Sequence, residues 1–404
     1  MKSMLFLLPT IPADYEERAR LRPIGRNVER TQQMIQQVRE IAQHADALGF
    51  DVLALTEHHF HSEGLEVSPA PLPFLVDLAV RTRRLKLATL ILALPTWDPL
   101  RLAEEIAMLD HLTQGRFIAG LGRGYQDRWV KVLGQRYGVG GATSDGSEQD
   151  RHNRDVFEEL FTIMKMAWTD DAIRYEGKHY EVPFPYEKGI VGWPAAKHWT
   201  AHYGAPDELD ADAASVRKIC VVPKPYTQPH PPLWQAFSGG RDTIEWCARE
   251  DIMMWSLASS TNLVEVAEAY RNACARHSRE RRLGENFGAF RMVYVGATYE
   301  EAFARGAAAL GDVFVRYFAD FGFFEGFRRP GESGPVPISF ERMVDAGFAI
   351  VGTVDQVRRQ IEALRQHVDP EWFGWYFDQG LLPQATLLEE LECFATKIMP
   401  DFRD

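Results

Sequence analysis

The chain has few cysteines and lacks a paired cysteine motif. Its four cysteines, Cys220, Cys247, Cys274 and Cys393, are scattered without CxxC spacing. Scattered thiols fit a reducing compartment better than a disulfide scaffold. We therefore expect a cytoplasmic protein in which the cysteines are small core or surface side chains, and none is a candidate nucleophile.

Long apolar runs and an excess of basic residues are also missing. Met4–Leu8 is too short for a signal peptide and is followed by acidic residues. No apolar segment approaches the roughly 20 residues that cross a bilayer. The formal net charge is −12, with 45 basic and 57 acidic side chains. This balance argues against a nucleic-acid partner, and we expect neither a membrane nor a nucleic acid among the partners.

What is present is an alternation of strand-like and helix-like hydrophobic periods. It runs through the first third of the 404 residues, loosens after Gly124, and resumes near residue 232. The expected strands are Met4–Leu8, Val52–Thr56, Leu85–Leu94, Phe117–Leu121, Pro232–Phe237, Ile252–Leu257, Phe290–Val295 and Trp372–Phe377. The expected helices are Val28–Leu48, Pro71–Arg83, Pro99–Thr113, Arg151–Trp168, one from Asp242, Leu263–Arg276, Tyr299–Leu310, Thr353–His367 and Gln384–Ile398.

This alternation predicts an α/β fold, because parallel neighbouring strands need crossover helices. Eight such strands most simply close as a (β/α)₈ TIM barrel with insertions after strands 4 and 7. A doubly wound open sheet is the alternative. We expect one domain over residues 1–404, with long inserted loops at about 126–150, 169–216 and 328–347.

The second expected strand ends in a polar string. In a barrel, functional side chains gather where strands end, and here one carboxylate and three imidazoles follow in Thr56-Glu57-His58-His59-Phe60-His61. An imidazole can exchange a proton near neutral pH. A solvated loop is one alternative, and a metal site using His59 and His61 is another. Beyond Asp378, further ligands at strand ends are not evident, so no metal is predicted.

A glycine-rich segment follows the fourth strand. Gly122 and Gly124 flank Arg123, and Tyr125 stands where a Rossmann fingerprint needs glycine. A guanidinium beside bare backbone is suited to a bidentate grip on a phosphate. The alternative is an arginine paired to a neighbouring acid.

A second candidate anion site follows the fifth strand. Ser238, Gly239 and Gly240 precede a helix with Thr243 in its first turn, where N–H groups and hydroxyls favour an anion. Plain capping by Asp242 with Glu245 is the alternative. Counted with Arg123, this segment predicts one phosphorylated mononucleotide cofactor. Most aromatic residues are expected in the core, and Tyr125 and Trp255 are candidates to line a substrate pocket.

With these motifs in place, the chain resembles the bacterial-luciferase-like flavin monooxygenase family. The matching segments occur in family order, span most of the chain and are densest over residues 50–125. They are Thr56-Glu57-His58-His59-Phe60, Leu94-Pro95, Asp98 to Glu105, Leu109-Asp110, Gly115-Arg116-Phe117, Gly120 to Gly124, Thr243 to Trp246 and Val351-Gly352-Thr353.

The resemblance implies an enzyme that receives reduced FMN from a separate flavin reductase. It would react the flavin with O₂ to a C4a-(hydro)peroxide and oxygenate a small organic substrate. His58 matches the catalytic histidine of the family, and the adjacent Glu57 is a candidate for setting its tautomer. Arg123 matches the arginine that holds the flavin phosphate.

The remaining cofactor positions also come from the resemblance. Ser238 and Thr243 match hydroxyl positions of the second phosphate loop, which Gly239 and Gly240 lengthen. Leu90-Ile91 matches a non-prolyl cis peptide under the isoalloxazine ring.

One departure and several alternatives bear on function. Gly122 stands where luciferases carry a reactive cysteine, so light emission is not the expected purpose. Alternatives are an F420-dependent hydride-transferring oxidoreductase of the same fold, a metal-dependent hydrolase and a non-catalytic partner subunit. The resemblance also implies a homodimer or higher homo-oligomer, since the apolar faces of helices Pro71–Arg83 and Pro99–Thr113 match those that form the dimer interface in this family. The type of oxygenation is open.

Overall fold

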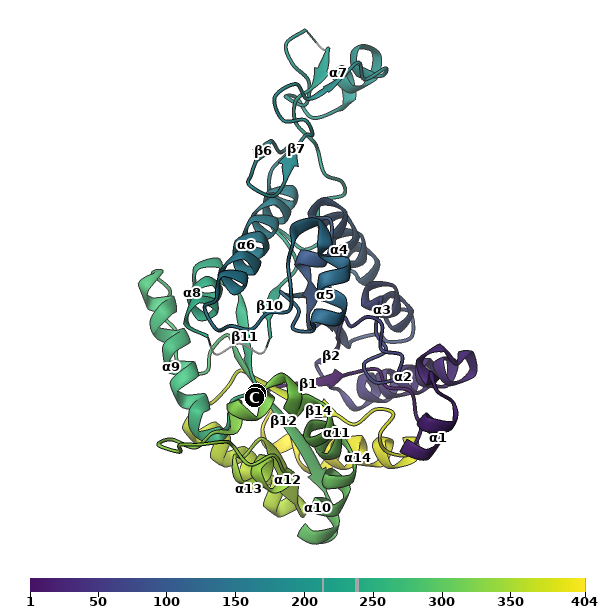
Figure 1. Ribbon diagram of the computed structural model, residues 1–404, viewed down its shortest axis with the longest axis vertical. Coiled ribbons are helices and arrows are strands. Elements are labelled where there is room, and N and C mark those ends of the chain that lie inside the picture. Colours follow the sequence, from purple (N-terminus) through teal and green to yellow (C-terminus); the bar gives the residue numbers. More distant parts are fainter. Residues whose placement is uncertain (213, 237–239, 404) are drawn as a thin grey trace. The chain divides into compact units, whose positions relative to one another are not determined.

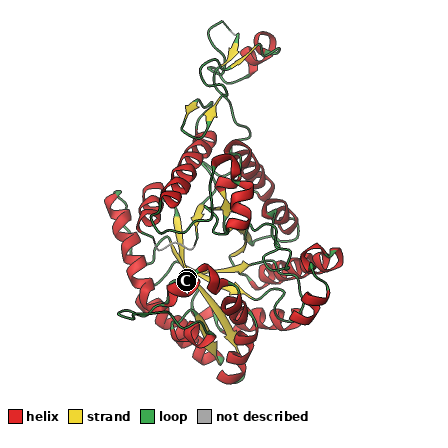
Figure 2. Cartoon of the chain, in the orientation of Figure 1, coloured by secondary structure: helices red, strands yellow, loops and turns green. Residues whose placement is uncertain are grey.

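The computed structural model describes residues 1–212, 214–236 and 240–403. The chain divides into two compact units. Unit 1 is formed by residues 1–91 and 233–404, and unit 2 by residues 92–232. Both units contain helices and strands (Figure 2).

Unit 1 holds a continuous run of parallel strands in the order β10-β11-β12-β14-β1-β2-β3. Strands β2 and β14 are buried at every residue, as expected where helices cover the outer face of a parallel sheet. The strands are β1 (Lys2–Leu7), β2 (Val52–Leu55), β3 (Lys86–Thr89), β10 (Leu233–Gln235), β11 (Met253–Ser256), β12 (Phe287–Val295), β13 (Ala349–Gly352) and β14 (Trp372–Phe377) (Figure 1).

The helices of unit 1 start and stop at recognisable capping residues. Asn27 caps the helix that starts at Val28, and Gly49 ends it with φ of +85°, a conformation that favours glycine. Thr353 and Gln356 form the capping box of a later helix. The helices are α1 (Tyr15–Arg20), α2 (Val28–Leu48), α3 (Pro71–Ala79), α8 (Arg241–Glu250), α9 (Ser260–Arg276), α10 (Tyr299–Ala308), α11 (Leu310–Arg316), α12 (Phe340–Asp345), α13 (Val354–His367) and α14 (Gln384–Lys397).

Unit 2 contains one parallel strand pair, three longer helices and two short antiparallel strand pairs. Helices α4 and α6 pack together, and the Trp168 indole N–H donates to the Ala103 carbonyl over 3.0 Å. Strands β6 and β7 form one antiparallel pair, and β8 and β9 form the other. The elements are β4 (Leu92–Ala93), α4 (Pro99–Thr113), β5 (Phe117–Gly122), α5 (Asp127–Leu133), α6 (Glu148–Thr169), β6 (Tyr175–Glu176), β7 (Glu181–Val182), β8 (Ile190–Val191), α7 (Ala201–Tyr203) and β9 (Ser215–Val216).

The predicted fold class is confirmed: eight strands, β1, β2, β3, β5, β10, β11, β12 and β14, form a closed parallel barrel with surrounding helices. Three local expectations need correction. The strand expected over Leu85–Leu94 is interrupted between Thr89 and Leu92. Strand β13 was not expected, and it pairs with the far half of the long β12. The loops expected at about 126–150, 169–216 and 328–347 contain elements of their own. The first contains α5, the second contains β6, β7, β8, α7 and β9, and the third contains α12.

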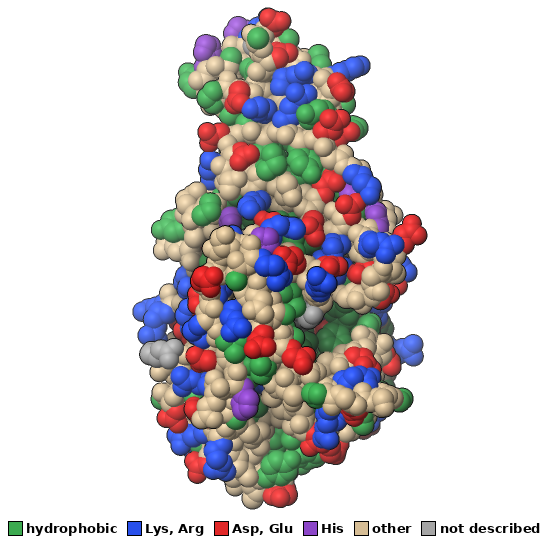
Figure 3. Space-filling model, turned by 90° about the vertical axis from the view of Figure 1, so that its left-hand side faces the viewer, with side chains coloured by type: hydrophobic (Ala, Val, Ile, Leu, Met, Phe, Trp, Pro, Cys, Tyr) green, Lys and Arg blue, Asp and Glu red, His purple; other side chains and the backbone are tan. Residues whose placement is uncertain are grey.

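No helix in the described part of the chain is long and apolar enough to cross a bilayer. Basic and acidic side chains are intermingled over the face drawn in Figure 3. The excess negative charge is therefore not gathered into a single patch on that face.

Candidate active site

The predicted catalytic histidine lies in unit 1, three residues beyond the end of β2. His58 is 7% exposed, and its Nδ1 is 3.0 Å from the Thr56 hydroxyl. Burial, with the neighbouring His61 and His59 as further causes, lowers the pKa of His58 well below its ordinary value. The imidazole is therefore neutral at physiological pH, which is the form that accepts a proton.

The carboxylate that faces His58 is not the one expected from the sequence. Glu57 Oε1 lies 2.9 Å from Nε2 of His59, because adjacent residues of an extended segment point in opposite directions. Glu66 takes the place expected for Glu57, with Oε1 at 3.4 Å from Nε2 of His58. The sequence analysis missed Glu66, and its only signal was an acidic residue in the loop that follows the histidine string.

Glu66 belongs to a buried polar cluster. Its Oε2 lies 3.6 Å from Nε2 of His61 and accepts a hydrogen bond of 3.4 Å from the Tyr317 hydroxyl. Glu66 has a φ of +51°, in the left-handed region where few residues other than glycine lie. The ends of β2 and α11 thus contribute to the same group of side chains.

The peptide bond Leu90–Ile91 is cis, as the resemblance implied. It follows β3, and the Leu90 N–H donates to the Leu55 carbonyl at the end of β2 over 2.7 Å. This bond and the histidine string therefore both follow the carboxyl ends of two paired strands. The contact of Leu90 and Ile91 with a cofactor stays a prediction.

Arg123 lies in unit 2, directly after β5, which ends at Gly122. Its guanidinium donates to Asp150 Oδ1 over 2.6 Å and to the Ser144 hydroxyl over 3.2 Å. This is the acid pairing that the sequence left open as an alternative. A phosphate would be a second acceptor for the same fork of donors, and that role stays a prediction.

Glycine at position 124 is required by the turn that follows Arg123. Its φ is +76°, and a Cβ there would lie 2.7 Å from the Trp129 ring. The next residue, Tyr125, is half-buried, and its hydroxyl accepts a hydrogen bond of 2.7 Å from the Gln126 amide. Its contact with substrate stays a prediction.

Ser238 and Gly239 lie outside the described residues. Gly240 is the N-cap of α8, and Thr243 is buried in the first turn. The alternative of capping by Asp242 with Glu245 does not describe this helix, since Gly240 is the N-cap and Glu245 binds Arg276 and His277. The binding of a phosphate by Gly240 and Thr243 stays a prediction.

Trp255 is a core residue in this structure. It is fully buried on β11, and its ring packs on Phe290 at 4.7 Å and on Trp234 at 5.2 Å between centroids. A Cβ on Gly288 would lie 2.3 Å from the same ring. Its predicted contact with substrate stays a prediction.

Among the described residues, no three His, Cys, Asp or Glu side chains are placed to hold a metal ion. The alternative of a metal site therefore has no set of ligands there. His59 and His61 also face different carboxylates, Glu57 and Glu66. The two imidazoles of the H-x-H motif therefore belong to two different histidine–carboxylate pairs.

Comparison with known proteins agrees with this geometry. The sequence matches the luciferase-like monooxygenase family over residues 1–369. The 3,6-diketocamphane 1,6-monooxygenase of Pseudomonas putida is 25% identical over 374 residues, covering 88% of this chain and 90% of the relative. The chain belongs to the luciferase-like monooxygenase family and is a flavin-dependent oxidoreductase.

Two solved structures have the same fold. One is described as the oxygenating constituent of 3,6-diketocamphane monooxygenase from Pseudomonas putida, a type II Baeyer-Villiger monooxygenase in complex with FMN. It matches with a TM-score of 0.74 and 20% identity, covering 99% of this chain and 98% of that one. The other is the coenzyme F420 dependent tetrahydromethanopterin reductase of Methanopyrus kandleri, with a TM-score of 0.64, 14% identity and coverage of 100% and 99%.

Proposed function

We propose that this chain is the oxygenating component of a two-component monooxygenase. It would take reduced FMN from a separate flavin reductase and use O₂ to oxygenate a small organic substrate. The observation that carries this proposal is His58, a buried and neutral imidazole at the mouth of the barrel, in a family of monooxygenases. Active sites of (β/α)₈ enzymes lie at that end of the strands.

The residues present fit FMN by the chemistry of their donors. The Arg123 guanidinium and the backbone at the start of α8, with the Thr243 hydroxyl, are groups that bind a phosphate. The cis bond at Leu90–Ile91 follows a strand paired with β2. When bound, reduced FMN supplies the electrons for oxygen chemistry.

His58 is the proton acceptor in this proposal. Because its imidazole is neutral, it can take a proton from a substrate hydroxyl or from an acidic C–H, and the substrate keeps the electron pair. The burial of His58 limits access of bulk water to the same nitrogen atoms.

The direct test is oxygen incorporation. Purified protein, FMN, a flavin reductase and NADH are incubated under ¹⁸O₂ with cyclic ketones, aldehydes, alkenes and phenols. One ¹⁸O atom in a product, formed only with both reductase and FMN, supports the proposal. Binding of F420 without FMN binding, together with hydride transfer and no ¹⁸O in any product, contradicts it and favours the F420-dependent alternative, a chemistry named for one structural neighbour.

The assembly is part of the same proposal. Helices α3 and α4 carry the apolar faces expected at a dimer interface, and Met108 and Leu112 of α4 are about half exposed. We expect a homodimer or higher homo-oligomer. Analytical ultracentrifugation of the purified chain measures this, and a monomer at micromolar concentration contradicts it.

A further inference from the structure

Glu66 is a buried acid that the function proposed above does not use. Its side chain is 2% exposed, and its oxygens face His58, His61 and the Tyr317 hydroxyl. A carboxylate buried this deeply needs hydrogen bonds or an opposite charge to compensate for lost solvation. Two imidazoles lie at these distances from the carboxylate and contribute to that compensation.

The two ring nitrogens of His58 face different groups. Nε2 is 3.4 Å from Glu66, and Nδ1 is 3.0 Å from the Thr56 hydroxyl. The backbone around both groups is tied to Ser68: the His58 N–H donates to the Ser68 carbonyl over 3.1 Å, and the Ser68 hydroxyl donates to the Thr56 carbonyl over 2.6 Å. A carboxylate on one nitrogen and a hydroxyl on the other is the arrangement of an oriented general base.

We propose that Glu66 is the positioning residue of His58, and that His58 exchanges protons with the substrate at Nδ1 through the Thr56 hydroxyl. This inference rests on the proposed function, in which His58 is the base. The substrate group loses one proton to the Thr56 oxygen and keeps the electron pair, while the Thr56 hydroxyl gives its own proton to Nδ1. His58 becomes an imidazolium whose Nε2–H faces the Glu66 carboxylate.

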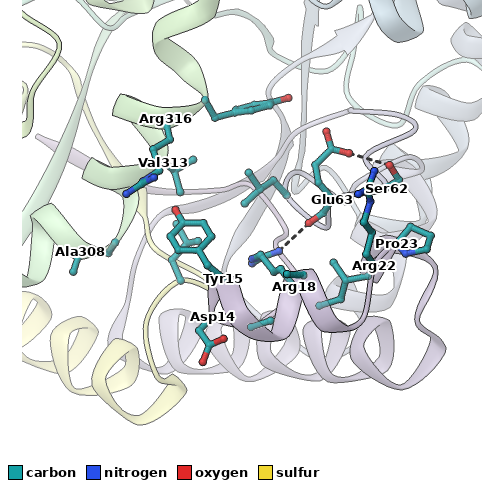
Figure 4. A pocket seen from close by; sticks show the side chains of 17 residues that line it. Asp14, Tyr15, Arg18, Arg22, Pro23, Ser62, Glu63, Ala308, Val313 and Arg316 are labelled. Atoms are coloured by element: carbon teal, nitrogen blue, oxygen red, sulfur yellow. Dashed lines mark hydrogen bonds between the residues drawn. The ribbon is translucent and has the colours of Figure 1, made fainter.

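The far side of Glu66 leads toward a larger cavity. Tyr317, which donates to Glu66, also lines a cavity of about 680 Å³ together with Arg18. Figure 4 shows Arg18 donating to the Glu63 carbonyl at the wall of this cavity. A void of about 10 Å³ borders Glu66 and shares Leu65 with the larger cavity, which is room for about one water molecule. Glu66 is therefore placed to pass the proton of His58 to solvent.

The first experiment replaces Glu66 by Gln, which keeps the shape and removes the charge. Other titratable groups lie around this pair: His61 and His59 near His58, and Tyr317 and Tyr376 near Glu66. The substitution leaves these four side chains in place. Loss of the negative charge disfavours the imidazolium. We expect the acidic limb of the kcat profile to move down by about one pH unit and kcat to fall roughly 30-fold. FMN affinity should stay within about twofold, since the change does not touch the phosphate donors.

A second readout does not depend on turnover. In histidine-labelled protein, ¹⁵N NMR reports which ring nitrogen carries the proton, with His58→Asn used to assign the signal. We expect Nε2–H and an unprotonated Nδ1 in the wild type, and a shifted Nε2 resonance in Glu66→Gln. A wild-type His58 protonated only at Nδ1, or a variant with unchanged resonances and an unchanged pH profile, would overturn the inference.

Glu390→Gln is the matched control, because it makes the same change in another buried carboxylate of unit 1. Glu390 pairs with Arg305 at 2.8 Å, so this variant should leave the pH profile and the His58 resonances unchanged. A similar shift of the profile in this control would overturn the assignment to Glu66.

Substitutions of Thr56 test the same inference even if the Glu66 variants do not fold. Thr56→Val removes the hydroxyl and should lower kcat about as much as Glu66→Gln, whereas Thr56→Ser should restore most of it. Full activity of Thr56→Val overturns the route through Nδ1. If the wild type incorporates no ¹⁸O into any product, the proposed function fails. If the wild type incorporates ¹⁸O and the Glu66 and Thr56 variants keep its turnover and pH profile, this inference alone fails.

Discussion

Two buried carboxylates of unit 1 and two carboxylates of unit 2 have pKa values shifted in opposite directions, although other acids of unit 1, such as Asp46, also have a lowered pKa. In unit 1, burial raises the pKa of Asp378 and of Glu390 to about 7. In unit 2, a hydrogen bond from Lys178 holds the pKa of Asp155 below its ordinary value. Asp150 likewise keeps a lowered pKa: burial opposes the shift, and the hydrogen bond and charge of Arg123 outweigh burial.

This difference distinguishes acids that can exchange a proton from acids that stay charged and pair with a cation. A group with a pKa near 7 changes its protonation state under physiological conditions, whereas a carboxylate with a lowered pKa stays ionised. The candidate base His58 and its neighbour Glu66 lie in unit 1, and the candidate phosphate ligand Arg123 lies in unit 2. We therefore expect changes in unit 1 to alter turnover and its pH dependence, and changes at Arg123 to alter cofactor affinity.

The largest effect is expected from His58→Asn. Removing the base should lower turnover by about 100-fold or more, because general-base catalysis contributes factors of this size. FMN affinity, measured by fluorescence titration, should stay within about twofold, since an imidazole is not a phosphate ligand in this proposal. A parallel loss of affinity and turnover would contradict the division of roles between the units.

Local signals explain which parts of the fold the sequence predicts. Helices α2 and α4 have the predicted bounds, Val28–Leu48 and Pro99–Thr113. Their starts are marked by Asn27 and Asp98 as N-caps, and their apolar faces keep the helical period. Strand β14 also has its predicted bounds. Such elements can be predicted from the residues that form and flank them.

The parts that the sequence did not predict depend on contacts between distant residues. Strand β13 forms because β12 is long enough to pair with it. The hydrophobic pattern of the four residues of β13 does not indicate the strand with which they pair. Glu66 reaches His58 only because Ser68 ties the loop to Thr56. The resemblance correctly placed the cis bond at Leu90–Ile91, which periodicity had read as part of a continuous strand.

The next effect concerns Arg123→Ala in unit 2. Loss of a charge-assisted pair of hydrogen bonds to a phosphate should weaken FMN binding by about 1.5–3 kcal/mol, which is roughly 10- to 100-fold. Arg136→Ala is the control, because Arg136 is exposed and pairs with Asp98. Isothermal titration calorimetry measures both. Unchanged affinity, with faster proteolysis of residues 138–147, would show that Arg123 serves only to hold Asp150.

The smallest effect tests the buried carboxylates themselves, through Asp378→Asn. Oδ1 of Asp378 accepts hydrogen bonds of 2.8 Å from the Tyr294 hydroxyl and the Leu310 N–H. Oδ2 has no hydrogen-bond partner among the described residues. Because the folded-state pKa is raised to about 7, the folded protein binds a proton that the unfolded chain releases near its ordinary pKa of about 4. This contribution to stability is complete below pH about 4 and is lost as the pH rises through about 7.

Asparagine imitates the protonated acid at every pH, so the variant should match the wild type near pH 4. At pH 8, where the wild-type acid carries its charge, the variant should be the more stable of the two. Urea unfolding followed by tryptophan fluorescence measures the difference at each pH. Asp155→Asn in unit 2 should behave in the opposite way, because the pKa of Asp155 is lowered by Lys178 and His179: it loses stability at pH 7, and the loss disappears as the pH falls below the folded-state pKa. Equal pH dependence in the two variants would mean that their surroundings do not shift the pKa values of Asp378 and Asp155 in opposite directions, and the comparison between these two acids would lose its physical basis.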